Sequence, residues 1–345
     1  MANIDDVARL AGVSKGTVSN VFTQKRGVRK EVAERVLKAA QALNFKPNYW
    51  ARTLSMKQTS IIGLRMPGEN TKFSKFHLSL INGVLQTCFE HGYRLLVNTL
   101  ATDYQEMPKY MTTNPVDGEI FLDPEHNDAR LMQRTELDPP AVVVGRPPEA
   151  LRHRLCYVDN DNETTAEQVT SYLLELGHRD ILFLNTSQQR TVSVDRKRGY
   201  EKALIQAGIA LKPKLHIFKN PSTPSLDYGF RSIRELVTKG VSFSAVVTDT
   251  DKVALGVYRA AAELGLSIPN DISVFAFSDD SVFSPEFHPP LSGVSLNAEE
   301  LGREAANLLI RRIQDNSAPI VHQTILSNLV VRQSCRNLNS TIIHL

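Results

Sequence analysis

Short apolar runs rich in β-branched residues recur from Thr59 onward, and amphipathic helical stretches separate them. The first half contains "SIIGLRM", "YRLLVNTL", "GEIFLD" and "PAVVVG", and the second half contains "DILFL", "LHIF", "SAVVT" and "ISVFAF". Strands that alternate with helices predict parallel sheets covered by helices. Because there are more such runs than one compact sheet holds, we predict two α/β lobes.

The first sixty residues differ from the rest of the chain in charge. They carry eleven Lys and Arg against four Asp and Glu, a net charge of +7, whereas the whole chain of 345 residues has a net charge of +3. The remaining residues therefore carry a net charge of −4. A basic segment joined to a slightly acidic body is typical of a phosphate-binding module. Charge alone would also fit a solvated basic face.

Composition excludes several other classes of protein. A 42% hydrophobic and 22% charged content fits neither a disordered chain nor a fibre. No apolar run approaches the roughly 20 residues of a membrane helix, and "MANIDDVARL" is acidic where a secretion signal is basic. We therefore expect a cytoplasmic protein. The three cysteines, Cys88, Cys156 and Cys335, lack metal-binding spacing and suit a reducing compartment, so we expect no metal and no cofactor.

Three helices are predicted in the basic segment. Asn3 is placed to cap a helix over residues 4–11, which Gly12 ends. Ser14 then caps a second helix whose apolar face holds two valines. A third helix covers "EVAERVLKAAQALNF" and stops before Pro47. The segment is therefore expected to be an all-α head.

The start of the second helix allows two interpretations. Residues 12–16, "GVSKG", match the G-x-S-x-G pattern of a hydrolase nucleophile elbow. Such an elbow needs a strand before it and a sheet around it, whereas a helix precedes Ser14. We therefore interpret Ser14 as a helix cap. Helix, Gly-containing turn and helix together predict a helix-turn-helix.

The second helix carries polar residues near its amino end, where side chains of such a module reach base edges in the major groove. These residues are Lys15, Gly16, Thr17, Ser19 and Asn20. Asn pairs with adenine through two hydrogen bonds, and Thr contacts a base or a thymine methyl group. A plain three-helix bundle would not need this polar face. We therefore predict that the head binds double-stranded DNA.

Several stretches, taken in order, resemble the LacI/GalR family of bacterial transcriptional repressors. They are "IDDVARLAGVSKGTVSNVF", "RVLKAAQALNFKPNYWARTLSMKQTSIIGL", "DNETTAEQVTSYLLELGHRDILFL", "DRKRGYEKAL", "AVVTDTDKVALGVYRAAAELGLSIPNDISV" and "FHPPLSGV". Each fragment alone is a weak signal. Together they cover roughly residues 3 to 335 in family order, which makes the resemblance specific.

The resemblance implies a domain organisation. Residues 1–46 would form the helix-turn-helix head, 47–59 a hinge helix and linker, and 60–340 a core of two Rossmann-like lobes of the periplasmic-binding-protein type. Lobe 1 would comprise about 60–160 plus 291–322. Lobe 2 would comprise about 161–290 plus 323–340. The chain would cross between the lobes three times, and "ATDYQEMPKYMTTNP" is shorter than the corresponding family segment.

The resemblance also implies which residues contact DNA. In the family a leucine of the hinge helix wedges into the minor groove; Leu54 matches it, and Arg52 matches a groove-contacting position. A hinge helix capped by Asn48 is too short to be stable alone in water. Asn20 departs from the usual arginine, and Arg29 replaces the usual small cap of the third helix. The predicted DNA-binding residues are Ser14, Lys15, Gly16, Thr17, Ser19, Asn20, Arg29, Asn48, Ala51, Arg52 and Leu54.

A small effector would bind between the lobes, at the strand ends where open α/β sheets hold ligands. The predicted effector-binding residues are Phe76, Arg146, Asp161, Arg196, Asp251 and Asp279. Phe76 matches an aromatic residue that stacks on the ligand, and Arg196 matches a ligand-gripping arginine. An interlobe salt bridge is the alternative for Arg196, a helix cap for Asp161, and Ser278 for the position given to Asp279. We expect His178 to be a structural turn residue.

These features predict a homodimeric regulator, a repressor of carbohydrate metabolism genes whose operator affinity a sugar-like effector controls. The effector would be a sugar, a phosphosugar or a related metabolite. The alternative is a sugar-binding protein or sugar-modifying enzyme without a DNA role. We find no Walker motif, no G-x-G-x-x-G after a strand and no metal cluster in the sequence, so we expect no catalysis. The chain ends soon after the last predicted strand, which favours a dimer over a tetramer.

Overall fold

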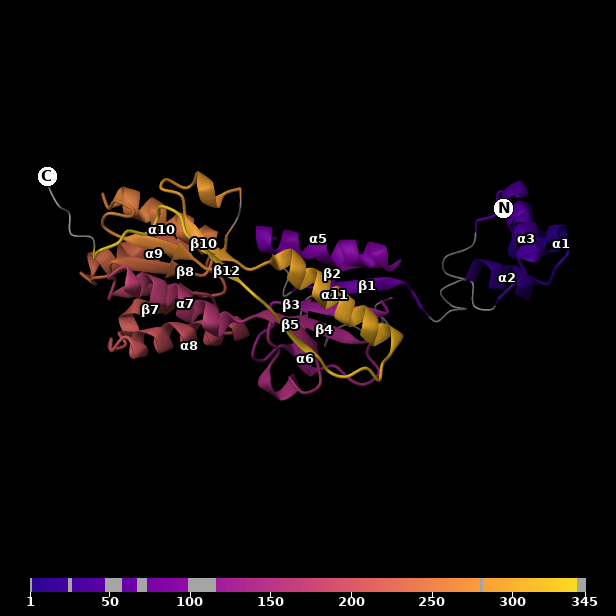
Figure 1. The fold of residues 1–345 in the computed structure, drawn as a ribbon, viewed down its shortest axis with the longest axis horizontal. Helices are drawn as coiled ribbons and strands as arrows, with labels where there is room; N and C mark the ends of the chain where they lie inside the picture. Colours follow the sequence, from indigo (N-terminus) through magenta and orange to yellow (C-terminus); the bar gives the residue numbers. More distant parts are fainter. Residues whose placement is uncertain are drawn as a thin grey trace. The chain divides into compact units, whose positions relative to one another are not determined.

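A computed structural model describes residues 2–23, 27–46, 58–66, 73–98, 116–279 and 282–339 of the chain (Figure 1). Internal contacts divide it into two compact units, Met1–Ser60 and Ile61–Leu345. The first unit is helical and the second contains two parallel sheets, as the sequence predicts. Each unit is described here by itself.

The head contains three helices, α1 (Ile4–Ala11), α2 (Lys15–Thr23) and α3 (Lys30–Ala42). The Asn3 side chain caps α1 by accepting the backbone N–H groups of Asp5 at 2.9 Å and Asp6 at 3.0 Å. Gly12 ends α1 with a φ of 62°, in the left-handed region that favours glycine. A buried apolar core joins the three helices and includes Val7, Val18 and Val36.

The third helix ends earlier than its sequence pattern predicts, and Pro47 lies outside the described residues. Asn44 adopts a φ of 49° and donates its N–H to the carbonyl of Gln41 at 3.1 Å, while Phe45 donates to Ala40 at 2.8 Å. This pair of bonds is a Schellman motif, which satisfies carbonyls at a helix end. Asparagine tolerates the left-handed conformation better than most residues, so Asn44 ends α3.

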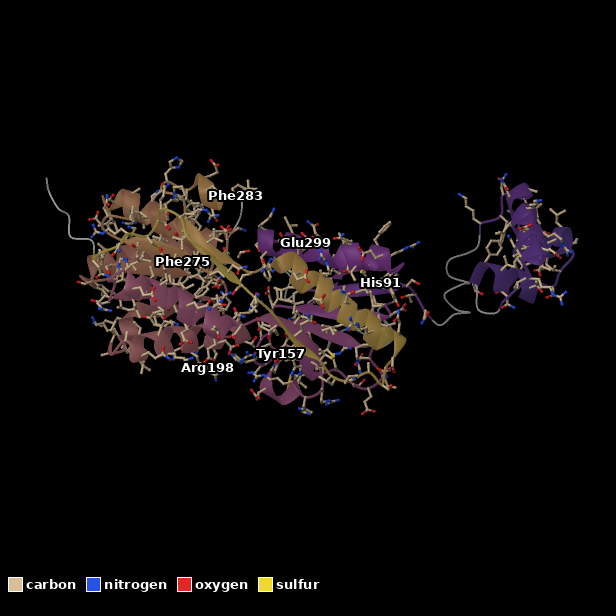
Figure 2. The ribbon with its side chains drawn as sticks, viewed as in Figure 1. His91, Tyr157, Arg198, Phe275, Phe283 and Glu299 are labelled. Carbon is tan, nitrogen blue, oxygen red and sulfur yellow. The ribbon has the colours of Figure 1, made fainter. Side chains whose placement is uncertain are left out.

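Lobe 1 of the core contains a sheet of six parallel strands in the order β11-β5-β4-β3-β1-β2. Its strands are β1 (Ile61–Arg65), β2 (Arg94–Asn98), β3 (Gly118–Leu122), β4 (Ala141–Val144), β5 (Cys156–Asn160) and β11 (His322–Ile325). The lobe also contains α5 (Lys75–Glu90), the short α6 (Ala129–Met132), the 3-10 turn Glu149–Leu151 and α11 (Ala298–Gln314). Tyr157, labelled in Figure 2, stacks on His322 with ring centroids 4.3 Å apart and so joins β5 to β11.

Lobe 2 contains the second six-stranded sheet, in the order β12-β10-β9-β8-β6-β7. Its strands are β6 (Ile181–Asn185), β7 (His216–Phe218), β8 (Ala245–Thr248), β9 (Ser273–Ala276), β10 (Ser292–Ser295) and β12 (Asn328–Val330), of which only β12 is antiparallel to its neighbour among the strands described. The helices are α7 (Asn162–Glu175), α8 (Thr191–Gln206), α9 (Ser225–Thr238) and α10 (Asp251–Glu263), with 3-10 turns at Pro213–Leu215 and Ser284–Glu286.

The chain crosses between the lobes after β5, after β10 and after β11. The last two crossings lie later than the expected lobe bounds at 291 and 323, because β10 pairs with β9 of lobe 2 and β11 pairs with β5 of lobe 1 through Ile325. Sequence pattern identifies a strand but not the sheet that it joins. The buried Asn160 side chain ties the crossings together by donating to the carbonyls of Leu296 at 3.1 Å and Ile325 at 2.9 Å.

Glycines allow the helices that cover the sheets to pack closely in pairs. A Cβ added to Gly302 of α11 would lie 2.1 Å from the Leu80 carbonyl oxygen of α5, and one on Gly83 would lie 2.0 Å from the Glu299 carbonyl. Gly199 plays the same part between α8 and α7, with a corresponding distance of 2.0 Å to the Glu163 carbonyl. These contacts need residues without a side chain.

The cysteines are free: Cys88 and Cys156 are buried, and Cys335 is partly buried. Burial raises the pKa of the Cys88 and Cys335 thiols to about 11. Within the described ranges, no cluster of three His, Cys, Asp or Glu side chains is arranged to hold a metal ion. No helix of those ranges is both long and apolar enough to span a membrane.

Candidate functional site

The amino end of α2 presents a polar surface above a buried anchor. Ser14, Lys15 and Gly16 are exposed, whereas Val18 on the opposite face is fully buried. Ser14 Oγ accepts the backbone N–H of Thr17 at 3.2 Å, as the predicted cap requires. Thr17, Ser19 and Asn20 are half-exposed. The face expected to read DNA is therefore accessible in the head.

Two basic side chains organise the turn between α1 and α2. Lys15 Nζ lies 3.0 Å from Asp5 Oδ2 in an exposed ion pair, which costs under about 1 kcal/mol to break. Arg35 of α3 donates to the carbonyls of Ala11 at 2.8 Å and Gly12 at 3.3 Å. A cation at the carboxyl end of a helix is favourable, so Arg35 holds the turn in place. The sequence reasoning missed this role because no local motif marks it.

The other predicted DNA-binding residues divide into two groups. Arg29 occupies the cap position of α3, is exposed, and makes no side-chain cap bond. Its guanidinium is thus available to a phosphate. The predicted hinge residues Asn48, Ala51, Arg52 and Leu54 lie outside the described residues.

Charged side chains meet where the carboxyl ends of strands from the two lobes come together. We name six of them the interlobe cluster: Asp123, Arg146, Arg190, Asp195, Arg196 and Asp249. Two ion pairs of this cluster join the lobes. Arg146 Nη1 lies 3.2 Å from Asp195 Oδ1, and Arg190 Nη1 lies 3.0 Å from Asp123 Oδ2.

The third ion pair of the interlobe cluster lies within lobe 2. Arg196 is buried, and its Nη1 lies 2.7 Å from Asp249 Oδ1 while its Nε donates to Asn162 Oδ1 at 3.1 Å. Its guanidinium carbon lies 4.6 Å from the centre of the Phe277 ring, within cation–π range. Arg196 therefore does not form the interlobe salt bridge considered as its alternative. Arg146 and Arg190 do so instead.

A histidine extends the interlobe cluster toward α5. Asp123 Oδ2 lies 3.1 Å from His77 Nε2, and His77 Nδ1 lies 2.7 Å from the Ser74 hydroxyl at the start of α5. Although burial raises the pKa of the Asp123 carboxyl, the charge of Arg190 and the hydrogen bond from His77 lower it well below its ordinary value. Asp123 is therefore an ionised acceptor at neutral pH. Neither it nor His77 was predicted.

The pKa of Asp159, a second carboxylate beside the interlobe cluster, is shifted in the opposite direction to that of Asp123. Burial, with a smaller contribution from the nearby Asp195 carboxylate, raises the pKa of Asp159 from 3.8 to about 7, although the charges of Arg146 and Arg196 lower it. Asp159 Oδ1 accepts from the Asn160 backbone at 2.8 Å and from Asn162 Nδ2 at 3.1 Å. Asp159 therefore changes its charge near neutral pH.

The structure places the remaining predicted effector residues in varied settings. Phe76 packs partly buried against the lobe 1 core, with its ring 5.7 Å from that of His77. Asp161 caps α7 by accepting the Thr164 N–H at 3.0 Å, which is the alternative considered for it. That carboxylate is thus already engaged by its own helix.

The region after β9 holds both candidates for one effector position. Asp279 Oδ1 lies 2.7 Å from Arg332 Nη1, whereas Ser278 Oγ accepts the Asp251 backbone N–H at 2.9 Å. Each side chain is thus occupied within lobe 2. His178 is buried against the Ser244 hydroxyl at 2.9 Å, a setting that fits the expected structural residue.

Both the head and the core of this chain are similar to known protein families. The family model for bacterial regulatory proteins of the lacI family matches residues 3–48, and the model for a periplasmic binding protein-like domain matches residues 170–335. The transcriptional regulator CelR of Thermobifida fusca is 30% identical over 335 residues, covering 96% of this chain and 97% of CelR. The chain belongs to the LacI family.

Other relatives within the LacI family agree with this assignment. The transcriptional repressor PurR of Histophilus somni strain 129Pt is 30% identical over 345 residues, covering 98% of this chain and all of PurR. The solved complex of CelR with cellobiose superimposes with a TM-score of 0.74 at 29% identity, covering 97% of this chain and 100% of that one. As a LacI-family member, the chain is a DNA-binding transcriptional regulator and not an enzyme.

Proposed function

We propose that this LacI-family regulator is a homodimeric repressor of carbohydrate metabolism genes, controlled by a neutral sugar bound between its lobes. The carrying observation is the interlobe cluster, in which arginines and carboxylates of both lobes converge on one place. A ligand there contacts both lobes at once, so it favours one lobe arrangement over another. That arrangement would decide whether two heads grip operator DNA in the cytoplasm.

The charges of the interlobe cluster favour a neutral effector. Arg146, Arg190 and Arg196 each pair with a carboxylate, so the anionic group of a phosphosugar would have to displace one. Asp195 Oδ2 and Arg146 Nε are both buried and have no hydrogen-bond partner within the described ranges. A hydroxyl group both donates and accepts, so a sugar hydroxyl would satisfy them together. CelR, a relative of this chain, has been solved with cellobiose.

A thermal-shift series would test the effector class. Cellobiose and a hexose phosphate would be compared as probes on the purified full chain. A ligand at 100 times its dissociation constant adds about 2.7 kcal/mol to the free energy of unfolding, so a true effector raises Tm measurably. We expect the neutral saccharide to do so. A larger shift with the phosphate would contradict the proposal.

An apolar face on lobe 1 supports the proposed homodimer. Leu78, Leu85 and Phe89 lie on one side of α5 and are 51%, 46% and 85% exposed. Leu96 and Val97 of the adjoining strand β2 are also exposed. In Figure 2, Phe283 of lobe 2 lies along the same upper edge of the core as α5. A second copy of the chain would cover this edge, since contiguous exposed apolar surface commonly marks an interface.

A gel shift with the DNA around the chain's own gene would test operator binding. Two heads would reach successive major-groove turns of a near-palindromic site, roughly 10 base pairs apart. We expect a saturable shift that survives excess unrelated DNA and that cellobiose alters. Binding without any sequence preference would overturn the proposed repressor function.

A further inference from the structure

The lobes touch through two loops outside the three crossings. Residues 123–126 follow β3 of lobe 1, and residues 187–191 lead into α8 of lobe 2 and include its first residue. Thr191 donates its N–H to the Pro124 carbonyl at 3.1 Å, and His126 donates to the Gln189 carbonyl at 2.9 Å. Glu125 and Arg190 form an antiparallel bridge between these bonds. The contact is therefore a short, register-specific pairing of backbone between the lobes.

We propose that Arg190 locks this pairing as an interlobe clasp, and that Asp123 and His77 transmit its state to the first turn of α5. The clasp is defined by residues 123–126 and 187–191. Arg190 is thus a positioning residue for the effector response. Neither its position in the sequence nor any motif assigns it such a role.

Arg190 contacts three oxygen atoms of lobe 1, whereas each backbone hydrogen bond of the clasp joins a single donor and acceptor. Its Nη1 lies 3.0 Å from both the carbonyl oxygen and Oδ2 of Asp123, and its Nε lies 3.7 Å from Glu125 Oε1. Burial lowers the pKa of Arg190, but Asp123, Glu125 and Asp249 together raise it above its ordinary value. The guanidinium therefore stays charged, and a planar fork can hold two such acceptors at once.

Asp123 is held in an unusual backbone conformation at the centre of the clasp. Its φ is 51°, in the left-handed region that non-glycine residues occupy infrequently. Such a conformation is strained and persists only where surrounding contacts hold it. Arg190 of lobe 2 contacts both its carbonyl and its carboxylate, so loss of Arg190 would leave Asp123 held only from lobe 1, by His77 at 3.1 Å and by Arg130 at 3.5 Å.

His77 connects Asp123 to α5 in one defined protonation state. The Ser74 backbone N–H, which can only donate, lies 3.1 Å from His77 Nδ1. His77 Nδ1 is therefore the acceptor, and Nε2 carries the proton that it donates to Asp123 Oδ2 at 3.1 Å. One carboxylate oxygen thus receives Arg190 from lobe 2 and His77 from the first turn of α5. Because α5 carries the exposed Leu78, Leu85 and Phe89, lobe movement reaches the proposed dimer surface through this oxygen.

The clasp also competes with an effector for the same groups. Asp249 and Asp123 act on both Arg190 and Arg196 electrostatically, so a ligand that rearranges one pair disturbs the other. This last step rests on the proposed function. The clasp itself depends only on contacts between residues of the core.

Hydrogen–deuterium exchange on the full chain, without DNA and without any sugar, tests the clasp. Arg190→Gln should raise exchange several-fold in segments 123–127, 187–191 and 73–80, although the last lies in the other lobe. Arg190→Lys keeps the positive charge but not the planar fork, so its exchange rates should lie between those of wild type and Arg190→Gln. Asp123→Asn should reproduce the effect in segment 73–80. Lys202→Gln, which removes an exposed ion pair with Glu167 of 2.7 Å within lobe 2, is the matched control.

Two results would overturn the clasp. Unchanged exchange in segment 73–80 of Arg190→Gln would show that α5 does not sense the other lobe. A uniform rise that includes β8 would show that Arg190 merely stabilises lobe 2. Because no effector or operator is present, neither result depends on the proposed repressor function, and failure of the sugar or DNA experiments would leave this measurement unaffected.

Discussion

Asn20 lies half-exposed on α2, nearly two turns beyond the Ser14 cap. We predict that Asn20→Ala weakens operator binding by about 1–3 kcal/mol, roughly 5- to 150-fold, because a bidentate amide–base contact is lost. Its salt dependence should stay unchanged, since no phosphate contact is lost. Arg29→Ala, by contrast, should weaken all sequences alike and reduce the salt slope, because the exposed Arg29 guanidinium is the predicted phosphate contact. Gel shifts at several salt concentrations distinguish the two, and equal loss on all sequences for Asn20→Ala would contradict base reading.

Asp159 gives a prediction about pH. Its raised pKa means that the folded chain binds this proton more tightly than the unfolded chain does, so wild-type stability from this group is present below pH 4 and lost as pH rises to about 7. Asp159→Asn removes that loss. The variant should gain up to about 4 kcal/mol over wild type at pH 8 and much less at pH 4, since a pKa raised from 3.8 to about 7 corresponds to that amount at about 1.4 kcal/mol per pKa unit.

Urea unfolding at the two pH values measures this difference. Glu90→Gln, at an exposed end of α5, is the control and should show no pH-dependent gain. A constant difference between Asp159→Asn and wild type across the range would mean that the carboxyl does not titrate there.

At this scale the sequence supports some roles and cannot reveal others. Ser14 was predicted as a cap because caps depend on neighbours within a few residues, and its bond to Thr17 confirms that prediction. Asp123 and Arg190 lie 67 positions apart and meet only once both lobes have folded. No local sequence pattern indicates that these two residues are in contact, so their pairing is seen only in the folded structure.

Gly302 makes the α5–α11 packing testable at the scale of the elements. Gly302→Ala would place its Cβ 2.1 Å from the Leu80 carbonyl oxygen, and backbone of a packed helix yields little. We expect a loss of about 1–3 kcal/mol in the free energy of unfolding, despite the better helix propensity of alanine. Gln86→Ala on the exposed side of α5 should change it by under about 0.5 kcal/mol. Equal stability of the two variants in urea would contradict the close helix contact.

Asn160 makes the crossing segments testable in the same way. Its amide donates to the carbonyls of Leu296 and Ile325, so Asn160→Ala removes the donor of two partly buried carbonyls at a cost of about 1–3 kcal/mol. Asn160→Asp should cost more, because a carboxylate would face those carbonyls. Hydrogen exchange in segments 296–298 and 325–328 should rise in both variants and stay unchanged in the exposed control Asn316→Ala. Slower exchange in either variant would exclude the proposed tie.

The sequence predicts well whether a segment forms a helix or a strand, but it does not predict which sheet a strand joins. Alternating apolar runs and helices predicted the parallel sheets that the structure contains. The strand Ser292–Ser295 was nevertheless assigned to lobe 1, because its pattern carries no information about its neighbours. The early end of α3 has a local signal in Asn44, whose left-handed backbone ends the helix before Pro47.

At the scale of the whole molecule, the apolar face of α5 predicts self-association. Phe89→Glu should shift the dimer toward monomer by at least tenfold in dissociation constant, because it puts a charge into the proposed interface. Ile205→Glu changes an equally apolar residue, 62% exposed on α8, and should leave the dimer intact. Sedimentation velocity across a concentration series measures both. A monomeric wild type, or equal effects of the two variants, would contradict this interface.

Three adjacent spans of backbone join the two halves of the core, and one asparagine amide stitches them together. Such a junction resists pulling apart and permits twisting about an axis that runs close to Asn160. We therefore expect the two lobes to rotate about this axis rather than to open and close. Displacement in that motion grows with distance from the axis, so spectroscopic probes at the remote ends of the core should respond to effector binding while probes beside Asn160 should not.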